Sequence, residues 1–144
     1  MKTFRVCRND PSAFIPSKAH TDDAGFDLST PCHFVLWPLE TKMIDTEVSI
    51  ELEPGYEAQI RGRSGLSRRG IIVPTGTIDA GYRGTIGVIL INLSDRDFKF
   101  QPGDRIAQMV IAEIPGVRLV EGAISKNTDR GANGFGSTGV GNAG

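Results

Sequence analysis

The stretch EVSIELEPGYEAQI, residues 47–60, contains two apolar alternations separated by a Pro-Gly pair. Val48, Ile50 and Leu52 occupy every second position before the pair, and the same period continues across residues 56–60. Because successive side chains of a β-strand point to opposite faces, this period predicts two half-buried strands. Proline and glycine are favoured in turns, so the two strands should separate at the pair.

The same punctuation continues outward from this stretch. Further Pro-Gly pairs begin at Pro102 and Pro115, and each lies beside an apolar segment. The run TIGVILINL, residues 85–93, is apolar at nearly every position, which predicts a strand buried on both faces. Short strands spaced by roughly 8–12 residues are typical of a β-sandwich or barrel. We therefore expect an all-β fold.

Composition narrows the classes of function. The chain has 144 residues, of which 39% are hydrophobic, and this suits one domain with a sizeable core. The net charge of -1 argues against bulk nucleic-acid binding, which favours a basic excess. Neither a signal peptide nor an apolar run of membrane-spanning length is visible. Cys7 and Cys32 form no Cys-x-x-Cys and no disulfide framework, so we expect a cytoplasmic protein without nucleic-acid or membrane partners.

The C-terminal stretch differs from the rest in composition. From residue 127 onward glycine is frequent and large apolar side chains are few, so burial cannot offset the entropy of ordering the chain. We expect a β-barrel domain over residues 1–126 and a mobile C-terminal segment over residues 127–144. Arg130 and Phe135 are unusual in a plain linker and suggest a role for the segment.

Four arginines lie in RGRSGLSRRG, residues 61–70. We expect a helix of about two turns here, with Ser64 as its N-cap and Gly70 as its C-terminal stop. Two interpretations of the charge are open. It forms a solvated cluster, or it forms a phosphate site in which Arg63, Ser64 and the N–H of Gly65 bind an anion at the helix N-terminus.

An acid, an aromatic ring and three glycines share GTIDAGYRG, residues 76–84. The glycines predict a hairpin that presents its backbone to a flat ligand, with Gly81 at its tip. Tyr82 offers a flat face, and Asp79 offers a base or a water-orienting carboxylate. A turn acid beside a tyrosine at a strand edge is the alternative interpretation.

Two other kinds of site find no support in the sequence. His20 and His33 are the only histidines, and they show no metal-ligand spacing. GFGSTG, residues 134–139, matches G-x-G-x-x-G, but too few residues follow it for the helix of a dinucleotide-binding fold.

Five short motifs follow one another along the chain. They are AGFDL at 24–28, RSGL at 63–66, GTIDAGYRG at 76–84, GDRIAQM at 103–109 and RGANGFGSTG at 130–139. In this order and with this spacing, they resemble the five motifs of the trimeric dUTP pyrophosphatases (dUTPases). One such motif is a weak signal, whereas five in order across most of the chain are very specific.

The resemblance implies a jelly roll or distorted β-barrel with one short helix and a flexible glycine-rich C-terminal arm. It implies a homotrimer whose active sites are shared between chains. The implied reaction is hydrolysis of dUTP to dUMP and pyrophosphate by water attack at the α-phosphorus, which keeps uracil out of DNA and supplies dUMP for thymidylate synthesis. Mg2+ is the implied cofactor, bound mainly through the substrate phosphates with no metal site made by the protein alone.

The resemblance also assigns roles around the nucleoside. The backbone of Gly76, Thr77 and Ile78 is expected to read the edge of uracil. Tyr82 is expected to pack against the deoxyribose and leave no room for a 2′-hydroxyl. Asp79 is expected to contact the 3′-hydroxyl and to orient the attacking water.

A second set of residues is assigned to the phosphates. Arg63, Ser64 and Gly65 are expected to hold phosphates from a neighbouring chain. Gln108 is expected to bind the phosphates or the attacking water. Asp27 is expected to act indirectly, near the waters of the metal or beside an arginine.

The C-terminal segment is implied to be a lid that orders when substrate binds. Phe135 is expected to stack over uracil, and Arg130 to reach the γ-phosphate. Gly136, Ser137 and Thr138 are expected to add phosphate contacts.

The chain departs from the family pattern at two positions. Val73 stands where many bacterial members have asparagine, and Gly87 where some have a longer side chain, so contact of either with substrate is open.

Two rival functions remain as alternatives. A dCTP deaminase of the sibling family would need a glutamate near residues 76–84, but none lies between Glu57 and Glu113. A nucleotide-gated regulatory binding protein on the same fold is the other alternative.

Overall fold

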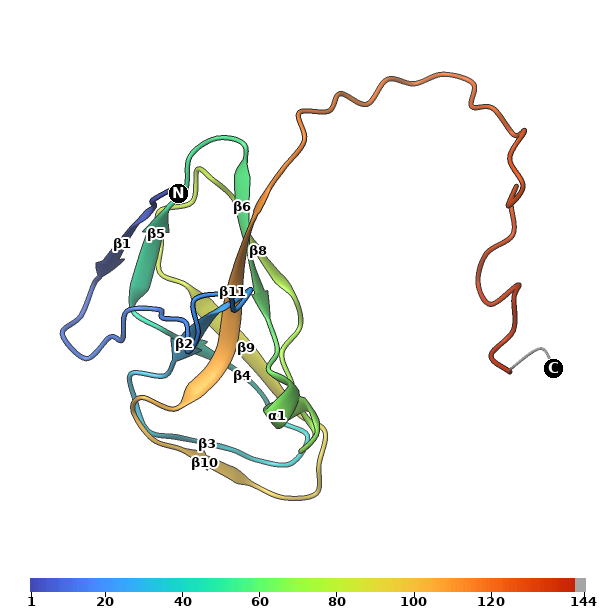
Figure 1. Cartoon of the computed structure of the whole chain (residues 1–144). Coiled ribbons are helices and arrows are strands. Elements are labelled where there is room, and N and C mark those ends of the chain that lie inside the picture. The colour runs from blue at the N-terminus through green and yellow to red at the C-terminus, as the bar shows by residue number, and fades with distance from the viewer. Residues whose placement is uncertain (142–144) are drawn as a thin grey trace.

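Short antiparallel strands wrap around one apolar core and form the body of the molecule (Figure 1). The computed structural model describes residues 1–141. Its elements are, in chain order, β1 (Arg5–Arg8), β2 (Phe26–Ser29), β3 (Phe34–Leu36), β4 (Thr41–Asp45), β5 (Val48–Glu51), β6 (Tyr56–Arg61), α1 (Ser64–Ser67), β7 (Ile71–Ile72), β8 (Gly76–Ile78), β9 (Gly87–Asn92), β10 (Phe98–Phe100) and β11 (Arg105–Glu113). The fold is an all-β jelly roll with one helical turn, so the predicted fold class is confirmed.

Four small sheets bring together segments that are far apart in the sequence. The strand orders are β2-β11-β6-β8, β4-β9-β7, β1-β5 and β10-β3. β11 pairs antiparallel with β2 on one side and with β6 on the other. Because of this placement, the motifs on β2, after β6 and on β11 lie beside one another.

The alternating stretch at residues 47–60 forms β5 and β6, as predicted. Val48, Ile50 and Ala58 are buried and point into the core. The chain turns between the strands at Gly55, whose φ of +91° lies in the left-handed region that favours glycine. The period of two therefore located both strands and their inward faces.

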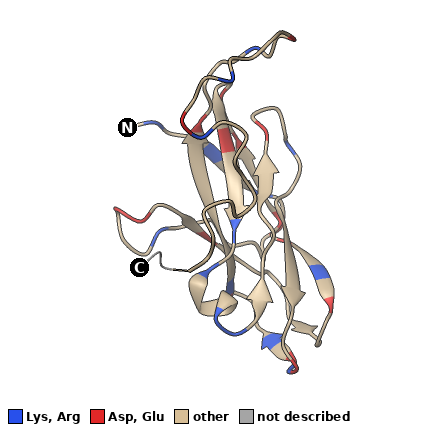
Figure 2. Ribbon diagram, turned by 90° about the vertical axis from the view of Figure 1, so that its right-hand side faces the viewer, with Lys and Arg blue, Asp and Glu red and all other residues tan. Residues whose placement is uncertain are grey.

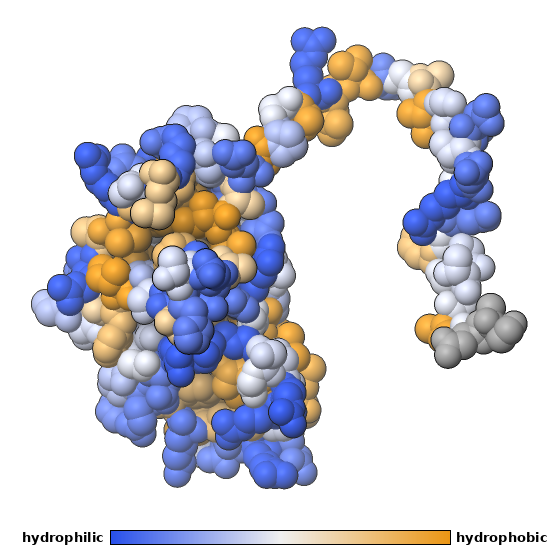
Figure 3. Space-filling view, viewed as in Figure 1, coloured by the Kyte–Doolittle hydropathy of each residue, from blue (hydrophilic) through white to orange (hydrophobic). Residues whose placement is uncertain are grey.

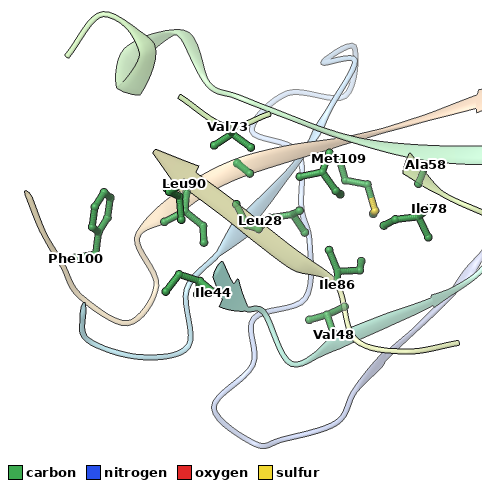
Figure 4. Packing of buried hydrophobic residues seen from close by; sticks show 14 of the residues in the cluster. Leu28, Ile44, Val48, Ala58, Val73, Ile78, Ile86, Leu90, Phe100 and Met109 are labelled. Carbon is green, nitrogen blue, oxygen red and sulfur yellow. The ribbon is translucent and has the colours of Figure 1, made fainter. Parts of the chain in front are cut away.

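The core consists mainly of aliphatic side chains from all the sheets (Figure 4). Leu28 of β2, Leu90 of β9 and Met109 of β11 are at most 1% exposed. Phe98 and Phe100 are the only phenylalanines among the buried residues of this core. Branched aliphatic chains thus supply most of the apolar area that stabilises the fold.

Replacing Leu90 by alanine should lower the free energy of unfolding by about 2–5 kcal/mol, because it leaves a cavity that the surrounding strands fill only in part. Urea denaturation at a fixed protein concentration measures this change. Leu119→Ala is the matched control, since Leu119 is 95% exposed and its truncation should change stability by no more than about 0.5 kcal/mol. Equal losses in the two variants would contradict the described core.

β9 does not have the two buried faces that its apolar run predicted. Val88 and Leu90 are fully buried, whereas Ile89 is 45% exposed. β9 is the middle strand of a three-stranded sheet, and only one face of that sheet packs on the core. Met43 of β4 lies opposite Ile89 in register and is also exposed. The prediction was wrong for the single chain, because an apolar pattern does not specify which surface covers it.

The predicted two-turn helix is a single turn, α1. Arg63 has extended backbone angles and is the N-cap, so the assignment of that position to Ser64 was wrong. The Arg63 carbonyl accepts hydrogen bonds from the N–H groups of Leu66 and Ser67, and the turn therefore begins one residue earlier than expected. Gly70, at φ +90°, then directs the chain into β7, which confirms its role as the stop. No helix within residues 1–141 is long and apolar enough to cross a membrane.

β11 ends at Glu113, and residues 114–141 then leave the body as an extended arm (Figure 1). The arm contains no strand and is exposed along nearly its whole length. Its large apolar side chains face solvent too (Figure 3): Ile114, Val117, Leu119, Val120, Ile124, Phe135 and Val140. The division of the chain at residue 127 stays a prediction, and residues 142–144 of that predicted segment lie outside the described residues.

Candidate active site

A small pocket of about 190 Å³ lies where β8 ends and β9 begins. Its lining residues are Ile60, Gly76, Thr77, Ile78, Asp79, Tyr82, Thr85, Ile86 and Gly87. Pockets that enclose a whole ligand usually measure about 300–1,000 Å³, so this one encloses only part of a ligand of that size. We call it the nucleoside pocket, after the group that the resemblance implies for it.

The nucleoside pocket is not built on a hairpin, so that prediction was wrong. β8 pairs with β6, while β9 pairs with β4 and β7 in a different sheet. The connection is a turn, closed by a 3.0 Å hydrogen bond from the N–H of Tyr82 to the carbonyl of Asp79, with Gly81 at its tip as predicted. Within residues 1–141, β8 pairs with no strand on its other side. That open edge leaves backbone donors and acceptors available to a ligand.

The carboxylate of Asp79 is exposed beside this edge. No side chain or backbone group within residues 1–141 forms a hydrogen bond or ion pair with it. Arg83 holds the turn that carries it, since its guanidinium donates to the carbonyls of Ala80 at 2.6 Å and Tyr82 at 3.0 Å. A carboxylate that the protein leaves unpaired, on a turn that the protein fixes, can bind a hydroxyl or a water.

The ring of Tyr82 forms another wall of the pocket and is 47% exposed. Its hydroxyl donates a 2.8 Å hydrogen bond to the carbonyl of Thr85. A Cβ atom added at Gly84 would overlap the hydroxyl end of the ring. Glycine at position 84 is therefore required by the position of the Tyr82 ring.

A separate groove gathers residues from the first, second and fourth motifs. Its lining includes Asp27, Arg63, Ser64, Gly65 and Gln108. It also includes Arg69 and Arg105, and basic segments flank the one-turn helix in Figure 2. We call it the phosphate groove, because so many guanidinium groups at one surface favour an anionic ligand.

Asp27 orders the arginines of the phosphate groove. Its carboxylate lies 3.1 Å from Nε of Arg63 and 3.5 Å from a terminal nitrogen of Arg105. Arg63 in turn donates to the carbonyl of Arg105 at 3.2 Å. The Asp27 side chain is only 20% exposed, so solvent competes weakly for these contacts. It thus fixes the direction of two cations and remains at the base of the groove.

Gln108 of β11 lies opposite both Asp27 of β2 and Arg61 of β6 in register. Its amide nitrogen donates to the carbonyl of Gly62 at 2.9 Å, which leaves its amide oxygen directed elsewhere. A Cβ atom added at Gly25 would overlap that oxygen. The central position of β11 therefore brings the first and fourth motifs together.

Within one chain, the predicted site residues form three separate groups. The nucleoside pocket and the phosphate groove share no lining residue. Arg130 and Phe135, with residues 136–138, lie on the exposed arm and line neither of them. Arg130 donates to the carbonyl of Asn133 at 3.0 Å, so it forms a contact inside the arm only.

The two departures from the family pattern have different positions. Val73 is buried in the core and lines neither pocket. Gly87 lines the nucleoside pocket, where an added Cβ would lie 3.2 Å from the sulfur of Met43. Gly25, Gly84 and Gly87 are pocket-shaping residues that sequence reasoning did not identify as such, since the sequence alone does not say which side chains approach a glycine.

Comparison with known proteins shows the family to which the chain belongs. A family model described as dUTPase matches residues 12–139. The chain belongs to the dUTPase family. It is 49% identical over 138 residues to a deoxyuridine 5′-triphosphate nucleotidohydrolase of Clostridium novyi (strain NT), a match that covers 94% of this chain and 97% of the relative.

Solved dUTPase structures share the fold over nearly the whole chain. A dUTPase mutant of Staphylococcus bacteriophage 80alpha, solved with dUpNHpp, superposes with a TM-score of 0.87 at 30% identity, and the match covers 97% of this chain and all of that one. A dUTPase mutant of phage phi11 of S. aureus, which reveals how a structural Mg(II) ion is coordinated, gives a TM-score of 0.76 at 29% identity over 84% of this chain and 98% of that one. The family model extends to residue 139, so the matched region of this dUTPase includes most of the arm.

Proposed function

We propose that this chain hydrolyses dUTP to dUMP and pyrophosphate by attack of water on the α-phosphorus. The observation that carries the proposal is the nucleoside pocket, in which the unpaired carboxylate of Asp79 lies between the open edge of β8 and the ring of Tyr82. The open edge of β8 suits a base, the Tyr82 ring suits a sugar, and the Asp79 carboxylate suits a water. The family membership supports the same reaction.

Base and sugar are selected by different parts of the pocket. The backbone of Gly76, Thr77 and Ile78 offers N–H and C=O groups at the open edge of β8, which match the alternating acceptors and donors of uracil. Tyr82 lies where the deoxyribose packs, so that a 2′-hydroxyl collides with its ring. Such steric exclusion needs a ring that is held in one position.

Replacing Gly84 by alanine should lower kcat/KM for dUTP by about tenfold, because relieving the overlap of the added methyl group with the Tyr82 ring costs about 1–3 kcal/mol. Steady-state kinetics with dUTP measures the change. Gly81→Ala is the matched control, since a Cβ added at Gly81 meets no atom within 4 Å. Equal kinetics for the two alanine variants would show that the Tyr82 ring position does not matter.

The phosphate groove positions the triphosphate for in-line attack. Arg63, Ser64 and Gly65 bind phosphate oxygens, and an added Cβ at Gly65 meets nothing, which leaves its backbone open to a ligand. Gln108 either donates its second amide N–H to a phosphate oxygen or accepts a hydrogen bond from the attacking water through its amide oxygen, since its other N–H is bound to the Gly62 carbonyl. Asp79 contacts the 3′-hydroxyl and orients the water. Catalysis is mostly positioning and charge neutralisation, as in other phosphoryl transfers.

Mg2+ suits this site as a companion of the substrate. Residues 1–141 hold no group of three or more His, Cys, Asp or Glu side chains able to bind a metal ion. Asp27, at the base of the phosphate groove, is already paired with Arg63 and Arg105. Because Mg2+ keeps several waters and favours phosphate oxygens, we expect the triphosphate to hold it, where it neutralises phosphate charge.

The separation of the three residue groups supports a homotrimer with shared active sites. The exposed outer face of β9 and β4, with Ile89 and Met43, offers an apolar surface for a second copy. The arm leaves the body and reaches outward, so it is free to close over the pocket of another copy (Figure 1). We infer that the nucleoside pocket of one chain, the phosphate groove of a second and the arm of a third form one site. We also infer a cytoplasmic location, where nucleotide pools lie.

The first test is pyrophosphate release from dUTP with Mg2+, beside dTTP, dCTP and UTP. Fast release from dUTP alone supports the proposed reaction and the selection of uracil and deoxyribose by the nucleoside pocket. No release from any of the four would leave nucleotide binding without hydrolysis, which is the regulatory alternative, and a search for a protein partner would follow. Release of ammonia from dCTP would indicate the deaminase alternative.

A further inference from the structure

The ring of Tyr82 has little packing to fix it, because it is 47% exposed. Its hydroxyl is instead attached to the carbonyl of Thr85. Any shift of the backbone at Thr85 therefore moves the acceptor of that hydrogen bond. The position of Thr85 is the feature on which the ring position depends.

The side chain of Thr85 is tied to a different turn of the molecule. Its hydroxyl donates a 2.8 Å hydrogen bond to one carboxylate oxygen of Asp45, the last residue of β4. The other carboxylate oxygen accepts the N–H of Glu47 at 2.8 Å. Glu47 has a φ of +56°, which is strained for a residue other than glycine, and the Asp45 carboxylate stabilises this turn. One carboxylate thus joins the β4–β5 turn to the wall of the nucleoside pocket.

The next residues along both segments strengthen the same connection. Thr46 is buried, and both its N–H, at 2.9 Å, and its hydroxyl, at 2.8 Å, donate to the carbonyl of Ile86. The N–H of Ile86 donates to the carbonyl of Val48 at 2.8 Å. The Thr85 hydroxyl and both backbone groups of Ile86 therefore bind residues 45–48.

We propose that Asp45 is a positioning residue that, through Thr85, fixes the ring of Tyr82 and thereby sets the preference for deoxyribose over ribose. The inference rests on the proposed function of Tyr82 and adds the part of the protein that makes it selective. Asp45 itself does not line the nucleoside pocket. Its effect reaches the sugar only through the Thr85 hydroxyl and the Thr85 carbonyl.

The test compares binding of dUpNHpp and its ribose counterpart by calorimetry, with Mg2+ present. Thr85→Val keeps the carbonyl and the shape of the side chain but removes the hydroxyl. Asp45→Ala removes the shared acceptor. In each variant the ratio of the two affinities should fall about three- to tenfold, the effect of one net hydrogen bond. In Asp45→Ala the kcat for dUTP should stay near that of the unsubstituted protein, because Asp45 lines neither the nucleoside pocket nor the phosphate groove.

Three further variants distinguish a positioning role of Asp45 from a general disturbance of the fold. Ser49→Ala removes a hydrogen bond of 2.8 Å with Asn9, which directly follows the neighbouring strand β1, and should leave the ratio unchanged. Asp45→Asn should restore most of the ratio, since an amide accepts from Glu47 and donates to Thr85. The Asp45→Ala, Thr85→Val double variant should lose no more selectivity than either single variant, because both substitutions remove the same hydrogen bond between Thr85 and Asp45.

An unchanged ratio in Thr85→Val and Asp45→Ala overturns the proposal, and so does an equal loss in Ser49→Ala. Failure of the proposed function gives a different result. If the unsubstituted protein prefers dUpNHpp over the ribose analogue but releases no pyrophosphate from dUTP, hydrolysis fails while the positioning role is still decided by the binding ratios.

Discussion

The Asp79→Asn variant should lose about 10²–10⁴-fold in kcat for dUTP with little change in KM, the range typical of a lost general base or water-orienting group. Asparagine keeps the size of the side chain but does not carry the charge that orients a nucleophilic water. The Asp79 side chain forms no hydrogen bond or ion pair with residues 1–141, so its loss should not disturb the turn. Steady-state kinetics and a single-turnover experiment together place the effect on the chemical step.

Asp95→Asn is the control for this experiment. The Asp95 side chain is 95% exposed and lies in the turn between β9 and β10, away from both pockets. Its kinetics should match those of the unsubstituted protein. A near-normal kcat in Asp79→Asn would contradict the role proposed for this carboxylate. A large rise in KM would instead indicate that Asp79 acts mainly in substrate binding.

Removal of residues 127–144 should lower kcat/KM for dUTP by about 10²–10³-fold, the cost of losing charge-stabilising donors from a closed site. Arg130 and Phe135 are then absent, and by the roles that the resemblance implies, the γ-phosphate would lose a guanidinium group and the base would lose a stacked ring. The melting temperature should not change, because the arm is exposed and forms few contacts.

Two point variants divide the effect of the truncation. Arg130→Ala should act on kcat/KM through phosphate binding, and Phe135→Ala through closure over the base. Val140→Ala, at another exposed position of the arm, serves as the control. An unchanged kcat/KM in the truncated protein would exclude the arm as a lid, and a lowered melting temperature would show that it supports the body.

Local sequence patterns predicted the positions of the strands well. They failed where burial or strand pairing depends on segments far away in the sequence. The period of two located β5 and β6 because each buries one face on the core. The same reasoning was wrong for β9, since its outer face, with Ile89, is exposed and not buried in the single chain. The hairpin prediction failed for a related reason, as the partner of β8 is β6, many residues earlier, and not the strand that follows.

The sequence motifs identified candidate residues but not their arrangement. The proximity of Asp27, Arg63 and Gln108 results from the register of β2, β6 and β11, which no local pattern contains. The N-cap of α1 was assigned to Ser64 because serine is a common N-cap, whereas Arg63 holds that position through its backbone carbonyl alone. Asp45 gave no signal, because an exposed acid in a turn has an ordinary sequence environment.

The exposed arm also makes this protein sensitive to proteases. Extended segments without secondary structure are the preferred sites of cleavage, so the arm should be cut long before the barrel. In the proposed trimer each arm completes one site, and a single cut would silence one site of three while the barrels stay folded. Activity would then decline in steps as arms are lost, and the amount of intact barrel in a cell would overstate the capacity to remove dUTP.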